Sequence, residues 1–180
     1  MIAAAITGGD LTLVNVVPDH VRALISKLSE AGVIIEETED GIRVRGDVNP
    51  LVATDIKTMP YPGFPTDLQS QFMALLTVAR GHSTVTETIF EARYKHIGEL
   101  NRMGADIRIE DRKAEVEGGQ TLHGAKVRAT DLRAGAALVL AGLVAEGTTE
   151  VSDIHYVERG YEEFTDKLTA VGAKIRKVEE

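Results

Sequence analysis

The sequence of 180 residues contains no cysteine and no tryptophan, and only 4% of its residues are aromatic. The absence of cysteine excludes disulfides, thiolate metal sites and a cysteine nucleophile within the chain. The longest apolar run, residues 134–145, has 12 residues, whereas a helix that crosses a bilayer needs about 20. The N-terminal residues lack the basic segment and hydrophobic region of a signal peptide. We therefore expect a cytoplasmic protein with no membrane partner.

Positive charge is also in short supply. Lysine and arginine number 20 against 28 aspartates and glutamates, which gives a net charge of −8. This balance argues against nucleic acid as a partner, because nucleic acid needs a basic face. A small anionic molecule is compatible with it, since a few converging arginines reverse the field locally. With 43% hydrophobic and 27% charged residues, the chain has the composition of one globular domain.

Three internal repeats organise the chain. Each contains an apolar helix, a β-branched strand, an amphipathic helix and a last strand. The amphipathic helices end at Gly32, Gly104 and Gly172, at intervals of 72 (104 − 32) and 68 (172 − 104) residues. Glycine is common just after the last turn of a helix. The repeat predicts a pseudo-threefold α/β arrangement, with buried helices inside and sheets with amphipathic helices outside.

The two kinds of helix differ in their patterns. Residues 134–145 are apolar or glycine throughout, residues 72–79 are nearly so, and residues 2–6 resemble the tail of a third such helix. A helix with no polar face is expected to be buried on all sides. The amphipathic helices instead place apolar side chains three or four residues apart on one stripe. The stripes are Val21, Leu24, Ile25 and Leu28; Ile97, Leu100 and Met103; and Tyr161, Phe164, Leu168 and Val171.

The last strand of each repeat is predicted at 33–35, at 107–109 and, in the third repeat, at 173–175, with hairpin partners for the first two. The first repeat starts inside its apolar helix, because Met1 takes the place of the segment that precedes the helix in the other two. A helix with no cap and no preceding strand is a poor place for a chain to begin. We therefore expect residues 1–180 to be a single domain from the C-terminal part of a longer protein, with its first repeat truncated at Met1.

Two acidic helix starts are candidate site positions. Thr66 and Thr130 are predicted N-caps, each followed by an aspartate, Asp67 or Asp131, at the first helical position. Thr66 also begins a T-x-x-Q capping box. The helix dipole favours such an aspartate on any helix, which is a purely structural interpretation. The functional interpretation is that both aspartates open onto one crevice at the helix N-termini, where anions and hydroxyls bind.

Arginines recur where a strand gives way to a helix. Arg93 and Arg159 each lie twelve residues after a glycine and beside a glutamate, and His20 has the matching place in the first repeat. A structural Arg–Glu pair explains this pattern, and so does a fork for phosphate or carboxylate. The five histidines show no metal-ligand spacing, and neither a G-x-G-x-x-G nor a P-loop pattern is present. We expect no metal and no cofactor.

Several long segments resemble those of a known family. They are F-P-T-D-L-Q-S-Q-F, E-T-I-F-E-A-R, L-N-R-M-G-A, A-T-D-L-R-A-G-A-A-L-V-L-A-G-L-V-A-E-G-T-T and E-R-G-Y-E. Over essentially all of its length the chain resembles the UDP-N-acetylglucosamine 1-carboxyvinyltransferases, the enolpyruvyl transferases that open peptidoglycan synthesis. The resemblance implies the two-domain inside-out α/β barrel of that family, in which each domain has three similar units. This chain corresponds to most of the C-terminal domain.

The resemblance also implies a reaction and roles for residues on one side of the site. The family transfers the enolpyruvyl group of phosphoenolpyruvate to the 3′-hydroxyl of UDP-N-acetylglucosamine and releases phosphate through a tetrahedral adduct. Asp67 matches the family aspartate at that hydroxyl, a proposed general base, and Thr66 belongs to the same substrate-binding segment. Ile89 matches a residue whose backbone contacts the UDP-sugar. Because a helix N-terminus favours an ionised carboxylate, we expect Asp67 to orient the hydroxyl more than to abstract its proton.

The other implied residues face phosphoenolpyruvate. Arg133 and Arg159 match arginines that meet it across the cleft, Asp131 matches a carboxylate near the reacting centre, and Arg93 matches a supporting cleft arginine. The family's mobile-loop cysteine or aspartate, its lysine and its further arginines belong to parts that this sequence does not contain. The resemblance therefore implies half of an active site, which needs the missing N-terminal domain as its partner and has no turnover alone.

Two alternatives remain open at this stage. A related enolpyruvyl transferase that acts on shikimate 3-phosphate has the same fold, although the E-T-I-F-E-A-R and A-T-D-L-R-A-G-A segments favour the UDP-sugar enzyme. The second alternative is a free-standing, non-catalytic binding or scaffold domain. Titration with UDP-N-acetylglucosamine separates the second alternative from a transferase, because a scaffold would not bind the sugar nucleotide.

Overall fold

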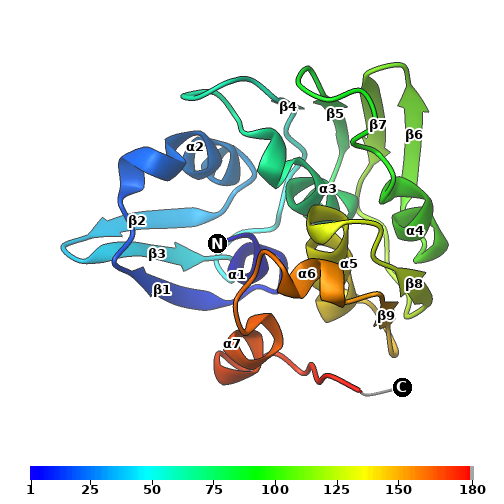
Figure 1. Cartoon of the computed structure of the whole chain (residues 1–180). Helices are drawn as coiled ribbons and strands as arrows, with labels where there is room; N and C mark the ends of the chain where they lie inside the picture. The colour runs from blue at the N-terminus through cyan, green and yellow to red at the C-terminus, as the bar shows by residue number, and fades with distance from the viewer. Residues whose placement is uncertain (179–180) are drawn as a thin grey trace.

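The computed structural model describes residues 1–178 and contains three α/β units that follow the three repeats (Figure 1). The first unit contains α1 (Ile2–Ile6), β1 (Asp10–Val14), η1 (Pro18–Val21), α2 (Arg22–Glu30), β2 (Ile34–Thr38) and β3 (Gly41–Arg45). The second contains β4 (Ile56–Lys57), η2 (Thr66–Leu68), α3 (Gln69–Val78), β5 (His82–Thr86), α4 (Ile97–Arg102), β6 (Asp106–Glu110) and β7 (Lys113–Glu117). The third contains β8 (Lys126–Arg128), α5 (Leu132–Val144), β9 (Glu150–Ser152), α6 (His155–Glu158) and α7 (Phe164–Ala170).

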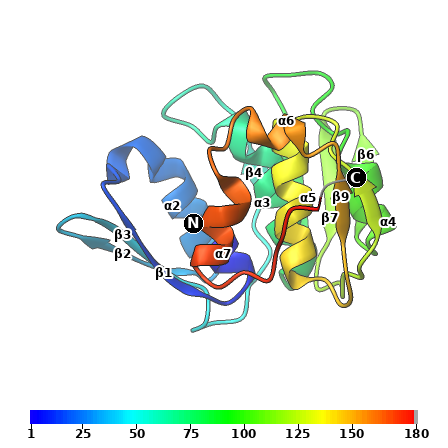
Figure 2. The same ribbon diagram turned by 60° about the horizontal axis from the view of Figure 1, so that its bottom comes forward.

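Each unit has its own sheet. The strand orders are β1-β3-β2, β4-β5-β7-β6 and β8-β9, and no strand joins two of these sheets in the described part of the chain. The pairs β4–β5 and β8–β9 are parallel, because each encloses a buried helix as a crossover, whereas the hairpins β2–β3 and β6–β7 are antiparallel. Figures 1 and 2 show the first sheet on one side of the molecule and the other two sheets on the opposite side, with helices between them.

The apolar helices form the centre of the molecule, as predicted. Residues 69–77 of α3 and residues 134–141 of α5 are buried, and α3 and α5 pack against each other. Small residues allow this close packing: a Cβ atom at Gly135 would lie 2.4 Å from Val157 Cγ2 in α6. Burial was predicted for all of residues 134–145, but residues 142–145 at the C-terminal end are only half-buried. That last turn adjoins the smallest of the three sheets.

The amphipathic helices agree with the prediction in the first two units only. Leu24 and Leu28 of α2 and Ile97 and Leu100 of α4 are buried, but no residue of α7 is buried. The strand predicted at 173–175 is also wrong, because these residues form no strand. In the first two units a hairpin strand, β3 or β7, holds the last strand and supplies buried side chains beneath the helix. No hairpin partner follows residue 172 in the part of the chain that the structure describes.

Two further sequence predictions concern helix ends and membranes. Gly32, Gly104 and Gly172 have φ values of +94°, +99° and +100°, so each repeat does use glycine to leave its amphipathic helix. Within residues 1–178, no helix combines the length and the hydropathy that a membrane span requires.

Candidate functional site

An ion pair between the second and third repeats marks the candidate site. Arg133, in the first turn of α5, donates from Nε to Asp67 Oδ1 at 2.7 Å, and its Nη2 lies 2.5 Å from the same oxygen. The Asp67 side chain is 63% exposed, so the pair is open to a ligand. Two residues that are 66 positions apart in the sequence therefore meet at neighbouring helix starts.

Asp131 is the N-cap of α5, so the helix starts one position later than predicted. Its backbone is extended, with φ −161° and ψ 176°, and its Oδ1 accepts hydrogen bonds from the backbone amides of Arg133 and Ala134, both at 2.9 Å. The N-cap is therefore Asp131 itself, and the prediction of Thr130 as the N-cap is wrong. Aspartate and threonine are both good N-caps, and aspartate adds a negative charge at the positive end of the helix. The bond to the Arg133 amide also fixes the start of the turn that carries the Arg133 side chain.

Thr66 does not form the predicted capping box. It is the first residue of η2, which follows Pro65, and no side chain caps that turn. The Thr66 hydroxyl instead donates to Oε2 of Glu87 at 2.9 Å, and the α-helix begins only at Gln69, which is buried. In a capping box the threonine oxygen accepts a hydrogen bond from a backbone amide of the helix, whereas here Thr66 is directed at the Glu87 carboxylate, to which its hydroxyl donates.

Ile89 lies in the loop after β5, and Glu87 also holds its backbone. The amides of Ile89 and Phe90 donate to Glu87 Oε1 at 2.8 and 3.2 Å. The Ile89 amide is therefore engaged within the chain, which leaves the carbonyl as the backbone group of Ile89 that a ligand would contact.

Neither of the two predicted Arg–Glu pairs forms. The Arg93 guanidinium lies 4.2 Å from the ring centroid of Phe90, in a cation–π contact, while Glu91 pairs with Arg112. Arg159 follows the last residue of α6 and is exposed, and the glutamate beside it pairs with Lys177. Neither Arg93 nor Arg159 forms an ion pair with any residue between 1 and 178. The prediction of an Arg–Glu pair at these two positions is therefore wrong.

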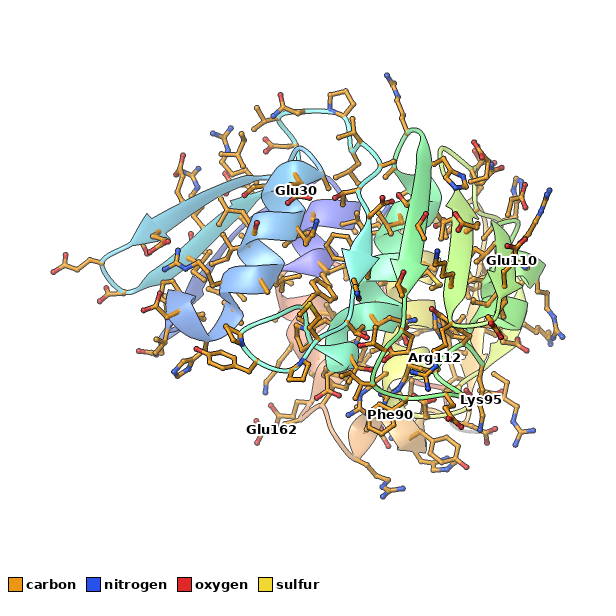
Figure 3. All side chains as sticks on the ribbon, turned by 90° about the horizontal axis from the view of Figure 1, so that it is seen from above. Glu30, Phe90, Lys95, Glu110, Arg112 and Glu162 are labelled. Carbon is orange, nitrogen blue, oxygen red and sulfur yellow. The ribbon has the colours of Figure 1, made fainter. Side chains whose placement is uncertain are left out.

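A cavity of about 570 Å³ lies at the loop that follows β5. Its lining consists of residues 89–93 and Arg112, and Figure 3 shows Phe90 and Arg112 close together there. The lining carries two guanidiniums, Arg93 and Arg112, and one carboxylate, Glu91, which leaves an excess of one positive charge (2 − 1) there on a protein of net charge −8.

Three residues near the site were missed by sequence reasoning. The Tyr161 hydroxyl accepts a hydrogen bond from Gln71 Nε2 at 2.8 Å. Burial raises the pKa of Tyr161; the bond from Gln71 and the charge of Arg133 act against this rise and the charge of Asp67 adds to it. His96 is 1% exposed, and burial lowers its pKa to about 4, so it is a neutral core residue. The third residue is Glu87, for which a lone glutamate in T-E-T carries no recognisable pattern.

The arrangement offers groups for a hydroxyl and for an anion. Within the described range 1–178, no three histidine, cysteine, aspartate or glutamate side chains lie close enough together to hold a metal ion. A carboxylate paired with a guanidinium at an open surface can instead accept a hydrogen bond from a ligand hydroxyl while the guanidinium binds phosphate or carboxylate.

Known proteins with similar sequences bear on this site. Residues 1–168 match the sequence model of the family described as EPSP synthase (3-phosphoshikimate 1-carboxyvinyltransferase). The UDP-N-acetylglucosamine 1-carboxyvinyltransferase 1 of Caldanaerobacter subterraneus subsp. tengcongensis is 59% identical over 97% of this chain and 42% of its own length. The UDP-N-acetylglucosamine 1-carboxyvinyltransferase of Desulfofundulus thermocisternus is 58% identical over 97% of this chain and 72% of its own length.

A solved structure of an enolpyruvyl transferase is similar to this chain as well. The enolpyruvyl transferase NikO from Streptomyces tendae superposes with a TM-score of 0.84 and 28% identity, over 97% of this chain and 42% of that protein. This likeness confirms the enolpyruvyl transferase fold that the resemblance implied. The chain spans less than half the length of the Caldanaerobacter relative and of NikO. By sequence and by structure, the chain belongs to the EPSP synthase (3-phosphoshikimate 1-carboxyvinyltransferase) family and, within it, to the UDP-N-acetylglucosamine 1-carboxyvinyltransferases.

Proposed function

We propose that this chain forms one wall of the active site of an enzyme that transfers the enolpyruvyl group of phosphoenolpyruvate to the 3′-hydroxyl of UDP-N-acetylglucosamine and releases phosphate. The observation that carries the proposal is the Asp67–Arg133 pair, which two repeats bring to one open surface. A carboxylate suits the hydroxyl that must be oriented, and a guanidinium suits the phosphate and carboxylate of the second substrate. Family membership supplies the substrate class.

On the sugar side, Asp67 accepts a hydrogen bond from the 3′-hydroxyl, and Thr66 and the Ile89 backbone belong to the same ligand site. Before the ligand arrives, the Asp67 carboxylate accepts a hydrogen bond from the Arg133 guanidinium. The main contribution of Asp67 is to hold the sugar oxygen at the distance and angle of attack. As the anion recruits Arg133, Asp67 becomes free for the hydroxyl.

On the anion side, Arg133 and Arg159 bind phosphoenolpyruvate, and Arg93 supports the cleft. Arg159 has no acidic partner within residues 1–178, so its charge is available to a ligand. Asp131 acts at the reacting centre by capping α5, because that bond fixes the backbone from which Arg133 extends. In the transfer, the sugar oxygen adds to the enol carbon of phosphoenolpyruvate as its hydroxyl proton is lost and the neighbouring methylene carbon takes up a proton, which gives the tetrahedral adduct. Loss of a proton from that methyl carbon and cleavage of the carbon–oxygen bond to phosphate then restore the double bond, and fixed guanidiniums stabilise the departing negative charge.

The remaining groups of the site belong to a second domain. Residues 1–180 are most of the C-terminal domain of a two-domain enzyme, and the missing N-terminal domain supplies the mobile-loop residue and the further cations. The isolated chain accordingly has no turnover. The complete enzyme acts in the cytoplasm in peptidoglycan synthesis, and through it in cell-wall formation, cell shape and cell division.

A titration tests this proposal. We expect the chain to bind UDP-N-acetylglucosamine, and we expect Asp67→Ala to weaken binding by at least about tenfold, since it removes a charge-assisted hydrogen bond. The matched control is Asp10→Ala, which breaks the surface pair of Asp10 with Arg43 in the first unit. Absence of binding by the unchanged chain would favour a scaffold domain. Equal affinity of the Asp67→Ala variant would refute the role of that carboxylate.

Two further assays complete the test. Phosphate release by the purified chain with both substrates would contradict the half-site assignment. Titration with shikimate 3-phosphate addresses the other enolpyruvyl transferase: tight binding of this compound, with none of the UDP-sugar, would transfer the proposal to that substrate.

A further inference from the structure

Glu87 is the one acidic side chain in the core of the described residues. It is 1% exposed and follows directly after β5. Its carboxylate accepts hydrogen bonds from four groups: the Thr58 hydroxyl at 2.8 Å, the Thr66 hydroxyl at 2.9 Å, and the amides of Ile89 and Phe90 at 2.8 and 3.2 Å. None of these donors is a cation. A buried carboxylate without a cationic partner depends on all of its hydrogen bonds, because each one offsets part of the cost of removing its charge from water.

The four donors come from three segments that are far apart in the sequence. Thr58 follows β4, Thr66 begins the turn η2, and Ile89 and Phe90 belong to the loop after β5. Oε1 holds Thr58 and the two amides, whereas Oε2 holds Thr66 alone. The carboxylate is thus divided: one oxygen shapes the loop of Ile89, and the other fixes the turn that carries Asp67.

The backbone of Glu87 is held just as firmly. Its amide donates to the Arg112 carbonyl at 2.9 Å and lies 3.1 Å from the Tyr94 hydroxyl. The next residue, Thr88, donates from its amide to Thr58 Oγ1 at 2.8 Å. Because the backbone cannot follow a shift of the side chain, any change at the carboxylate is passed to Thr66 and to the loop amides.

We propose that Glu87 is a positioning residue for the sugar-nucleotide site: its two oxygens hold the Asp67 turn and the Ile89 backbone at a fixed separation, so that both reach one ligand. This inference rests on the proposed function, in which Asp67 and Ile89 contact UDP-N-acetylglucosamine. Glu87 itself lies in the core and touches no substrate.

The chemistry at this position requires a carboxylate of this length. A glutamine has the same shape, but only one of its two terminal atoms accepts hydrogen bonds. Its oxygen can serve Thr58 and the loop amides, and its nitrogen then faces Thr66, whose hydroxyl must turn from donor to acceptor. An aspartate is one methylene shorter and cannot reach both segments. Glu87→Gln should therefore still hold the loop of Ile89 but hold the Thr66 turn less firmly, and Glu87→Ala should hold neither segment.

The first experiment needs no ligand. Amide hydrogen exchange of the isotope-labelled chain should be at least about tenfold faster at Ile89 and Phe90 in Glu87→Ala, because both amides lose their acceptor. Thr66→Val removes only the bond to Oε2, so it should leave these two amides unchanged within about twofold. The control is Glu115→Gln, which removes a carboxylate bonded to Thr84 and His82 in the same sheet. Unchanged exchange at Ile89 and Phe90 in Glu87→Ala would overturn the proposal.

The second experiment measures affinity for UDP-N-acetylglucosamine. We expect Thr66→Val and Glu87→Ala to weaken binding by about tenfold, and the control Glu115→Gln, which changes a carboxylate outside the site, to bind as the unchanged chain does. A purely structural role would lower the melting temperatures of Thr66→Val and Glu87→Ala without changing their affinities. Wild-type affinity in Thr66→Val would refute the positioning role and leave the proposed function standing.

If the unchanged chain does not bind UDP-N-acetylglucosamine, the proposed function fails, and the exchange experiment still decides whether Glu87 holds the two segments. Should Glu87→Ala not fold, Thr66→Val and Glu87→Gln carry both tests.

Discussion

Replacement of Gly135 by alanine tests the close packing of α5 against α6. Arg159 directly follows α6, so this packing determines where Arg159 lies. Gly135 lies in the buried part of α5, where an added Cβ would be 2.4 Å from Val157 Cγ2 and 2.9 Å from Ala129 Cβ. Carbon atoms pack at about 3.5–4.0 Å, so α6 would have to move by roughly 1 Å. Val157 is fully buried and β-branched, and its side chain has little freedom to rotate away.

The magnitude follows from two opposing effects. Overpacking a tight core costs about 1–3 kcal/mol, and the unyielding contacts on both sides favour the upper end of that range. Alanine gains about 0.5–1 kcal/mol over glycine within a helix. We therefore expect Gly135→Ala to destabilise the chain by about 2 kcal/mol, which lowers the melting temperature by roughly 4–8 °C in a domain of this size.

The matched control is Gly98→Ala in α4. An added Cβ at Gly98 meets no atom within 4 Å, so this variant should be more stable by about 0.5 kcal/mol. Scanning calorimetry of both variants is the assay. If Gly135→Ala melts at or above the wild-type temperature, the contact between α5 and α6 is looser than described and the placement of Arg159 loses its support.

Three further predictions concern the core, the pH response and the ion pair. Phe72 is fully buried and meets Phe64 edge-on at 5.3 Å, so Phe72→Ala should cost about 3–5 kcal/mol in denaturant titrations. Burial lowers the pKa of His96 from 6.5 to about 4, so stability should be full above pH 6.5 and fall as the pH drops towards 4; His96→Gln should lose this part of the pH dependence of the melting temperature. Arg133→Met breaks an exposed pair, so it should change stability by less than about 1 kcal/mol, yet it should abolish phosphoenolpyruvate binding by the complete enzyme. A large loss of stability would instead make the Asp67–Arg133 pair structural.

Local patterns were sufficient for the elements whose partners lie close by in the sequence. The apolar spacing predicted α2 and α4, and the near-absence of polar residues over 72–79 predicted burial of that part of α3. The same reasoning failed for α7 and for residues 173–175. Whether a residue such as Leu168 is buried depends on a sheet beneath it, and whether residues 173–175 form a strand depends on a hairpin partner. Neither property is encoded in the segment itself.

The site was predictable to a similar extent. The repeat indicated that Asp67 and Asp131 occupy equivalent positions at two helix starts, and the fold brings Asp67 within hydrogen-bonding distance of Arg133, two residues after Asp131. The cap of α5 was misplaced by one residue, because a threonine followed by an aspartate offers two good caps and only the backbone conformation of Asp131 decides between them. Glu87 was missed, because the local sequence around a glutamate does not show whether its side chain is buried or exposed. Its burial follows from three segments that meet in space.

The most direct test of the proposed function is to record amide chemical shifts of the isotope-labelled chain while UDP-N-acetylglucosamine is added. We predict that the largest changes in amide chemical shift occur in residues 66–68, 89–90 and 133–134. These are the turn of Asp67, the loop of Ile89 and the start of α5. Saturable shifts confined to these three segments would support the site. Shifts centred on the first unit, or no shift at any ligand concentration, would contradict it.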